Sequence, residues 1–199
     1  KTLAALALGA AIADGHIRSV DEPVATYLPE WADDPRGAIR IRDLLQMASG
    51  LAQVRFTLNP FAQDSAFRFL NSSDRAAVYL STPAVMPPAR EFDYNDLNAA
   101  LVGLIVQRAT GRPWSEWLDQ KIWRPMGGQR AEVWLDREGE GATAMTACCM
   151  LAPAMDWVRV GLLMKDRGLV RGVPVLPAGW IDAMITPSPA YPGYGYFTW

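Results

Sequence analysis

The segment 2–13 constrains the fold more than any other part of the sequence, because it carries no charged side chain. It is too short to cross a bilayer, which takes about 20 apolar residues. A helix in this segment has no polar face, so protein has to cover it on all sides. Lys1 before it and the small residues at its end are also typical of a secretory signal peptide. Composition alone leaves both interpretations open.

The bulk composition is that of a single globular domain. A chain of 199 residues with 50% hydrophobic content can bury one sizeable core. Nineteen basic and twenty-one acidic residues give a formal charge of -2, and no basic cluster stands out. Nucleic-acid binding therefore has little support, and the composition is not that of a disordered chain.

Histidine and cysteine are scarce, which limits the possible chemistry. His16 is the only histidine of the sequence, and the polar stretch around it predicts an exposed turn. A Ser-His-Asp triad or a zinc site is therefore not favoured. Cys148 and Cys149 are neighbours whose Cα atoms lie about 3.8 Å apart, below the usual disulfide range of roughly 4.4–6.8 Å. We predict a buried pair of free thiols, which weakly favours a reducing compartment.

The spacing of apolar residues predicts a chain made mostly of helices. Strand patterns are few, at 131–135 and at 194–199. The prediction is an α+β fold in which a helical layer still needs a sheet to pack against. Beyond the first segment, helices are expected at 41–49, 73–80, 97–108, 113–122, 157–164 and 177–185.

Four blocks of sequence together resemble the serine β-lactamase and penicillin-binding-protein superfamily, and most of all its class C-type esterases and 6-aminohexanoate-oligomer hydrolases. Their order and spacing carry the resemblance, which covers nearly the whole chain. It implies a β-lactamase/transpeptidase-like fold, with residues 1–199 forming a single partial domain cut at both ends. The blocks are K-T-L with D-G-H-I and Y-L-P-E, then I-R-D-L-L-Q-M-A-S-G-L, then F-D-Y-N-D with T-G-R-P, and finally D-W-V-R-V-G-L-L with L-P-A-G-W.

The resemblance also implies roles for three residues. Lys1 matches the lysine of the S-x-x-K motif, so the nucleophilic serine is expected three residues before it, and one helical turn places both side chains on one face. Tyr94 matches the tyrosine of the Y-x-N motif. Asp96 stands where many members carry asparagine, as a predicted substrate-binding residue. An ionised carboxylate accepts hydrogen bonds but cannot donate them, which weakens the case for a β-lactam preference. The family's K-T-G or H-T-G strand is expected after Trp199.

The chemistry implied is acyl transfer by a serine hydrolase acting on an ester, linear amide or β-lactam carbonyl, with Lys1 and Tyr94 as the general base pair. Alternatives are a non-catalytic relative that binds or regulates, an inactive fragment, and a helical membrane-associated protein that rests only on the first segment. The expected partner is a small ester or amide substrate. The resemblance implies no metal or organic cofactor. Oligomeric state and a cytoplasmic or a periplasmic or secreted location stay open.

Overall fold

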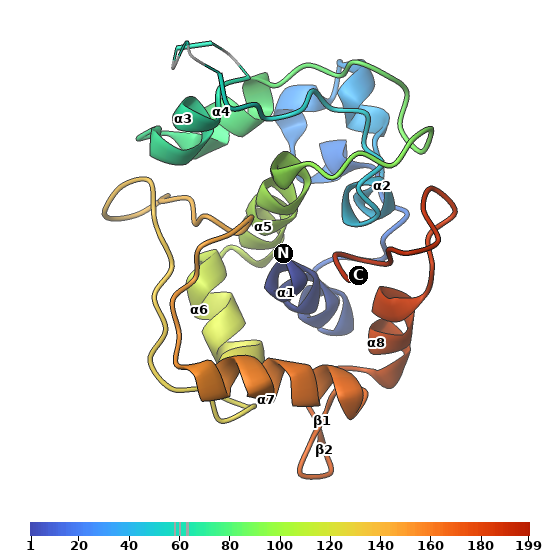
Figure 1. The fold of residues 1–199 in the computed structure, drawn as a ribbon, viewed down its shortest axis with the longest axis vertical. Helices are drawn as coiled ribbons and strands as arrows, with labels where there is room; N and C mark the ends of the chain where they lie inside the picture. Colours follow the sequence, from blue (N-terminus) through green and yellow to red (C-terminus); the bar gives the residue numbers. More distant parts are fainter. Residues whose placement is uncertain (58, 60, 63) are drawn as a thin grey trace.

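The computed structural model describes residues 1–57, 59, 61–62 and 64–199. Helix α1 (Thr2–Ala13) lies at the centre of the molecule, and the other long helices are arranged around it (Figure 1). Its residues from Leu3 to Ala11 are buried, as the apolar segment predicts for a helix without a polar face. The buried helix is therefore the interpretation that the structure supports for this segment.

Two tryptophans donate hydrogen bonds to backbone carbonyls of α1. The indole nitrogen of Trp117 donates to the carbonyl of Ala7 at 3.0 Å, and that of Trp180 donates to Ala5 at 3.1 Å. A Cβ on Gly9 would lie 2.1 Å from the Trp180 indole nitrogen. Glycine at this position is what allows the indole to approach the helix backbone so closely.

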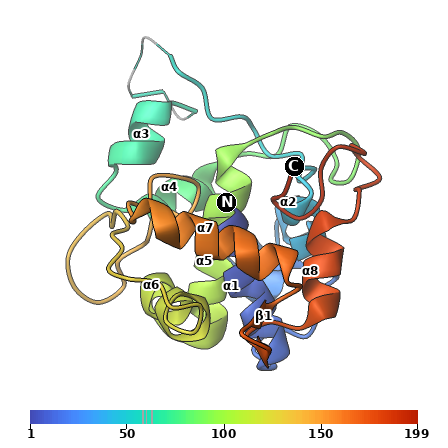
Figure 2. The same cartoon turned by 60° about the horizontal axis from the view of Figure 1, so that its bottom comes forward.

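The first half of the chain forms short elements around α2 (Ile41–Leu45), α3 (Ala66–Asn71) and α4 (Arg75–Ser81). Asp43 and Asp74 accept hydrogen bonds at the first turns of α2 and α4, as N-terminal carboxylates commonly do. In both views, α3 lies on the side of the molecule opposite α8 (Figures 1 and 2). Three 3₁₀ turns precede α2: Val24–Thr26, Pro29–Trp31 and Pro35–Ala38.

The second half supplies the longer helices. Helix α5 (Asp96–Thr110) packs against α1 and ends at Gly111, whose φ of 65° is a left-handed helix end. The next elements are α6 (Trp114–Leu118), a π-helical turn (Asp119–Trp123), α7 (Ala154–Lys165) and α8 (Ala178–Ile185). Thr2 donates a hydrogen bond to the carbonyl of Phe197 at 2.9 Å, so the two ends of the described chain lie side by side.

The strand prediction was wrong in detail. The segments 131–135 and 194–199 form no strand in the described structure. The first meets its neighbours only at isolated bridges, whereas a strand needs consecutive pairs. The sheet that is present is a hairpin of β1 (Leu169–Val170) and β2 (Val173–Pro174). Its turn residues Arg171 and Gly172 both have positive φ, 50° and 81°, which is the tight-turn geometry that suits a hairpin.

Each predicted helix overlaps a helix of the structure, but the first and last residues differ. Helix α2 stops at Leu45, earlier than the predicted 41–49, and α7 begins at Ala154, earlier than 157. The predicted helix 113–122 is divided into α6 and the π-helical turn. The sequence analysis did not predict α3. Helix ends depend on local capping and packing, which apolar spacing does not report.

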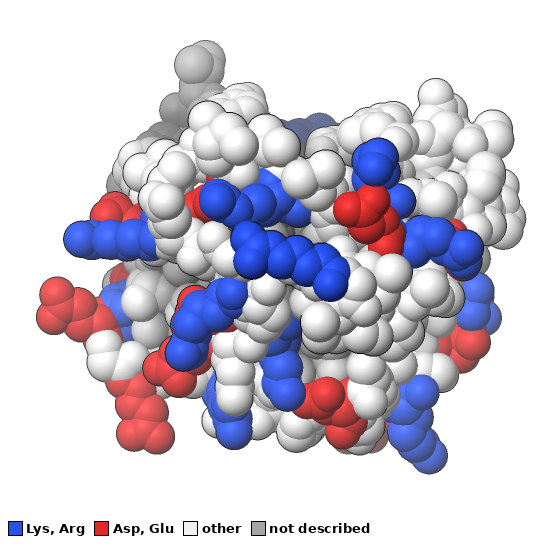
Figure 3. Space-filling view, turned by 90° about the horizontal axis from the view of Figure 1, so that it is seen from below, with Lys and Arg blue, Asp and Glu red and all other residues white. Residues whose placement is uncertain are grey.

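The surface carries interspersed charges. On the face seen from below, Lys and Arg side chains alternate with Asp and Glu (Figure 3). Arg124 pairs with Asp119, and Arg159 pairs with Asp156. Among the helices of the described residues, we find none that is both long and apolar enough to cross a membrane.

Candidate active site

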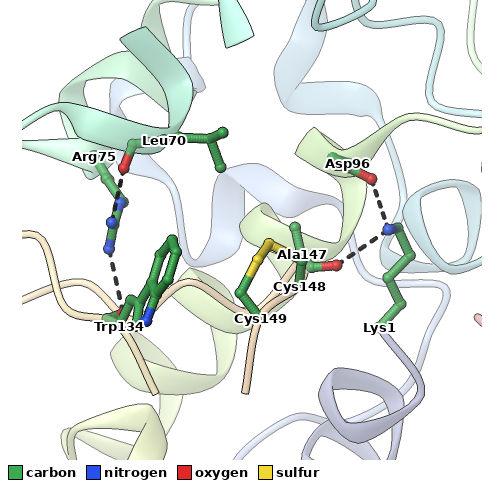
Figure 4. The surroundings of a disulfide bond; sticks show 8 residues. All are labelled: Lys1, Leu70, Arg75, Asp96, Trp134, Ala147, Cys148 and Cys149. Carbon is green, nitrogen blue, oxygen red and sulfur yellow. Dashed lines mark hydrogen bonds and ion pairs between the residues drawn. A yellow bond between two sulfur atoms is a disulfide. The ribbon is translucent and has the colours of Figure 1, made fainter. Parts of the chain in front are cut away.

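Lys1 stands directly before α1, and its side chain is only 14% exposed. Its amine lies 2.6 Å from an Asp96 carboxylate oxygen and donates to the carbonyl of Ala147 at 3.1 Å (Figure 4). The same nitrogen lies 4.8 Å from the centre of the Tyr94 ring. Two segments that are far from Lys1 in the sequence, at 94–96 and at Ala147, therefore converge on its amine.

The loop before α5 positions Tyr94. Asn95 caps the helix by accepting from the N–H of Leu97 at 3.0 Å, and its own amide donates to the carbonyl of Ala52 at 3.0 Å. Gln53 donates to the backbone carbonyl of Tyr94 at 3.1 Å. These bonds tie the loop to the segment 51–53 and place the Tyr94 ring, which is 41% exposed, next to Lys1.

Asp96 is the first residue of α5, where the helix dipole stabilises a carboxylate. Its side chain is 41% exposed and bonds the buried Lys1 amine, which makes a short, charge-assisted pair. The sequence predicted a substrate contact at Asp96. The structure places this carboxylate on Lys1, and its role as a substrate contact stays a prediction.

The Ala147 carbonyl is a site component that the sequence analysis missed. The neighbouring Thr146 hydroxyl donates to the carbonyl of Ala99 on α5 at 2.8 Å, in a buried position. A Cβ on Gly103 would lie 2.3 Å from the Thr146 hydroxyl oxygen, so glycine there lets this segment lie against α5. A backbone carbonyl leaves no residue-type signal, and only the fold could show its contact with Lys1.

The structure brings together all three residues predicted for the site: Lys1, Tyr94 and Asp96. The detail differs from the expected arrangement. The Lys1 amine lies over the face of the Tyr94 ring, as in a cation–π contact. The hydrogen bonds of the amine go to Asp96 and to Ala147. The catalytic roles of Lys1 and Tyr94 stay predictions.

An aromatic cluster surrounds Tyr94, made of Phe92, Tyr94, Tyr191, Tyr194 and Trp199. Phe92 stacks on Tyr191 with ring centres 4.9 Å apart, and Tyr194 meets Trp199 at 4.8 Å. Burial, with the nearby Tyr94 and Asp96, raises the pKa of Tyr194 above its ordinary value of 10.0. Tyr194 therefore keeps its proton near neutral pH. The sequence pattern at 194–199 predicts a strand, and only the fold shows that this aromatic run lies next to Tyr94.

The cysteine prediction was wrong. Cys148 and Cys149 form a disulfide, with their Cα atoms 3.7 Å apart, and they are half-buried and exposed respectively. The usual Cα distance range does not cover neighbouring cysteines, which can close a small ring through their own peptide bond. The disulfide lies next to Ala147 and so next to the candidate site (Figure 4).

His16 lies in an exposed turn after α1, as predicted. Its ring and that of Trp117 lie in a T-shaped arrangement, with ring centres 5.2 Å apart.

A cavity of about 640 Å³ opens beside the candidate site. Its wall is mainly apolar, and the Lys1 side chain and the disulfide both contribute to it. Helix α7 contributes Trp157, Val160 and Met164 to the apolar part, and other segments supply the rest. The dimensions of the cavity fit a small organic molecule.

The Beta-lactamase family model matches residues 1–179, and the chain therefore belongs to the Beta-lactamase family. The fold agrees, because the chain superposes on solved structures of this superfamily. It aligns with the D-stereospecific amidohydrolase from Streptomyces sp. at a TM-score of 0.71 and 21% identity, over 99% of this chain and 67% of that one. The penicillin binding protein from Bacillus halodurans aligns at a TM-score of 0.71 and 17% identity, over 98% and 66%.

Among curated proteins, the chain is similar to the 6-aminohexanoate-dimer hydrolase of Paenarthrobacter ureafaciens. The two are 27% identical over 194 residues, which cover 93% of this chain and 48% of that protein. The chain thus spans about half the length of this relative. These comparisons confirm the resemblance and the fold class that the sequence blocks predict.

Proposed function

We propose that this chain forms the lysine–tyrosine part of a serine hydrolase site, which cleaves a small ester or linear amide through an acyl-enzyme. The observation that carries the proposal is the position of the Lys1 amine. It is largely buried, 4.8 Å from the Tyr94 ring centre, and held by Asp96 and the Ala147 carbonyl. A lysine held in this way next to a phenol is suited to proton transfer.

The nucleophile in this proposal is a serine three residues before Lys1. The serine oxygen attacks the substrate carbonyl carbon as its proton passes to the Lys1–Tyr94 pair. The tetrahedral intermediate collapses, and the pair returns that proton to the departing alcohol or amine. Water then attacks the acyl-enzyme, gives its proton to the pair and releases the acid, and the serine recovers its proton.

The substrate class follows from the relatives and from the site. One relative is named for hydrolysis of the 6-aminohexanoate dimer, and one structural neighbour is named as an amidohydrolase. The cavity beside Lys1 has a largely apolar wall, which suits an uncharged acyl chain. A β-lactam carbonyl is the less favoured substrate, since Asp96 presents a carboxylate bound to Lys1 where an amide donor is expected.

Hydrolysis of a chromogenic ester by the full-length protein tests the proposal. We expect Lys1→Met and Tyr94→Phe each to lower kcat/KM by roughly 10²-fold or more, the usual range for a lost general acid or base. The gene sequence before Lys1 gives an independent check, because the proposal requires serine at the third position upstream.

Tyr191→Phe is the matched control. It removes a tyrosine hydroxyl from the same aromatic cluster, but the Tyr191 ring stacks on Phe92, and the contacts found for the Lys1 amine in the described structure are with Asp96, Ala147 and Tyr94. We expect its kcat/KM to stay within about twofold, as for other surface changes. Alanine or glycine in place of the upstream serine, or full turnover in Tyr94→Phe, would reject the proposed mechanism.

A further inference from the structure

The disulfide between Cys148 and Cys149 lies in an accessible position at the candidate site. Cys149 is exposed, and both residues line the cavity of about 640 Å³ beside Lys1. A small thiol can therefore reach the bond without unfolding the chain. Access and the identity of the attacked sulfur are what govern thiol–disulfide exchange.

The disulfide is also one residue away from a contact of the site. Ala147 precedes Cys148, and its carbonyl accepts the hydrogen bond from Lys1 at 3.1 Å (Figure 4). Closing a ring through the peptide bond of Cys148 and Cys149 restricts the backbone that directly follows this carbonyl. The oxidation state of the pair therefore bears on where the carbonyl points.

The segment 147–150 makes few other hydrogen bonds. At one end, the Thr146 hydroxyl donates a hydrogen bond to the carbonyl of Ala99. At the other end, Leu151 and Glu132 exchange two backbone hydrogen bonds of 2.8 Å each. Between these anchors, none of its N–H groups donates to another backbone carbonyl of the described residues. The disulfide and the bond to Lys1 are thus the covalent and polar ties of this segment, in addition to the burial of Ala147 in the core and the packing of Cys148 and Met150 against it.

The backbone of Cys149 indicates what reduction would release. Its φ is 74°, a left-handed conformation that is unfavourable for a residue with a Cβ. In the open form, residue 149 is free to leave this conformation for the ordinary region. Such a change would alter the path of the backbone two residues after Ala147.

We propose that Cys148–Cys149 is a thiol–disulfide exchange site for a dithiol reductant, and that its oxidation state controls how the Ala147 carbonyl holds the Lys1 amine. The control of turnover rests on the proposed function, while the exchange chemistry does not. The oxidised form holds the carbonyl on Lys1, and the reduced form releases it.

The chemistry is a complete two-electron exchange. One thiolate of the dithiol attacks the exposed sulfur of Cys149, a mixed disulfide forms, and Cys148 departs as a thiolate that takes up a proton. The second thiol of the reductant loses its proton. Its thiolate attacks the other reductant sulfur, which is bonded to Cys149 in the mixed disulfide. Cys149 is released as a thiolate and is protonated, and the reductant becomes a cyclic disulfide.

Dithiothreitol added to the folded protein tests the exchange site. We expect no thiol before treatment and two after it at residues 148 and 149, measured by alkylation and peptide mass spectrometry without denaturant. If the two thiols can be alkylated only after unfolding, or before any reductant is added, the exchange site is rejected.

Hydrogen exchange and turnover test the coupling to Lys1. In the reduced protein, we expect faster amide exchange at Glu132 and Leu151, whose paired backbone hydrogen bonds anchor the end of the segment 147–150. In the full-length protein, we expect ester turnover to fall roughly fivefold, the effect of about one hydrogen bond. Two thiols with unchanged amide exchange and unchanged turnover would overturn the coupling.

The double variant Cys148→Ser with Cys149→Ser is the matched control, because it cannot close the ring. We expect it to show the exchange pattern and turnover of the reduced protein and to be insensitive to dithiothreitol. Oxidised wild-type behaviour in this variant would overturn the proposal. A full-length protein without ester turnover in either state would reject the proposed function, while the thiol and amide-exchange results still decide the exchange site.

Discussion

The three neighbours of the Lys1 amine act on it with different strength. Asp96 makes the shortest contact, a charge-assisted bond of 2.6 Å to a side chain that is mostly buried. The Ala147 carbonyl adds a directional bond, and the Tyr94 ring adds a weaker attraction to its face. We infer that Asp96 decides where the amine points. The Asp96 carboxylate is partly exposed, which limits what the ion pair contributes to overall stability.

Asp96 variants separate positioning from substrate binding. In the full-length protein, we expect Asp96→Ala to lower kcat roughly tenfold or more, because a hydrogen bond to a charged group contributes about 1.5–3 kcal/mol. Asp96→Asn keeps an oxygen that can accept from Lys1, and we expect it to recover most of that loss. Steady-state kinetics with a chromogenic ester measures both variants.

The split between kcat and KM decides between the two roles of Asp96. A positioning role predicts that kcat changes while KM stays near the wild-type value. A large rise in KM with kcat unchanged would instead assign Asp96 to the substrate, as the sequence resemblance implies.

At the scale of elements, α5 organises the site. Asn95 caps its N-terminus and Asp96 is its first residue, and Thr146 packs against Ala99 and Gly103 further along the helix. One helix thus sets both the carboxylate and the carbonyl that bind Lys1. The α5 side of this contact is built from small residues, since a larger side chain would displace Thr146.

Gly103→Ala tests this role of α5. The added Cβ would lie 2.3 Å from the Thr146 hydroxyl oxygen and 2.5 Å from its methyl carbon. We expect the free energy of unfolding to fall by about 1–3 kcal/mol, as in other overpacked cores. We also expect lower ester turnover in the full-length protein, because the Ala147 carbonyl moves with Thr146.

Gly161→Ala is the matched control for stability. Gly161 lies within α7 and has no atom within 4 Å of its added Cβ. Alanine there should raise stability by about 0.5–1 kcal/mol, through helix propensity alone. Urea unfolding measures both variants. Equal effects of the two substitutions would contradict the close packing of Thr146 on α5.

At the scale of the whole molecule, one continuous hydrophobic core surrounds α1. Side chains from both halves of the sequence contribute to it, including Leu44, Val102 and Ile181. Some apolar side chains on α7 nevertheless stay exposed, among them Met155 and Val158. The shared core is the feature that should govern how the chain unfolds.

A thermal melt of the 199-residue chain tests this shared core. We expect one cooperative transition, with the same midpoint by circular dichroism and by tryptophan fluorescence. Leu6→Ala, in the buried centre of α1, should lower both midpoints together and reduce stability by about 2–5 kcal/mol. A broad transition, or midpoints that differ between the two signals, would show that the helices do not share one core.

The sequence by itself determined most helix positions and the family, and the resemblance to that family favoured a buried helix at 2–13 over a signal peptide. These follow from local patterns, because apolar spacing and the ordered motif blocks are properties of short segments. It also placed Lys1, Tyr94 and Asp96 in one candidate site, through the resemblance. The strand predictions failed because a strand depends on a partner that local pattern does not specify.

The tertiary structure alone decided which residues contact one another at the site. The Ala147 carbonyl reaches Lys1 across 146 residues of sequence, and the aromatic cluster joins residues near 92 with residues near 199. The position of the disulfide beside Lys1 likewise follows from the packing of Thr146 on α5. Such contacts come from chain segments that meet only when the core closes around α1, so no local pattern encodes them.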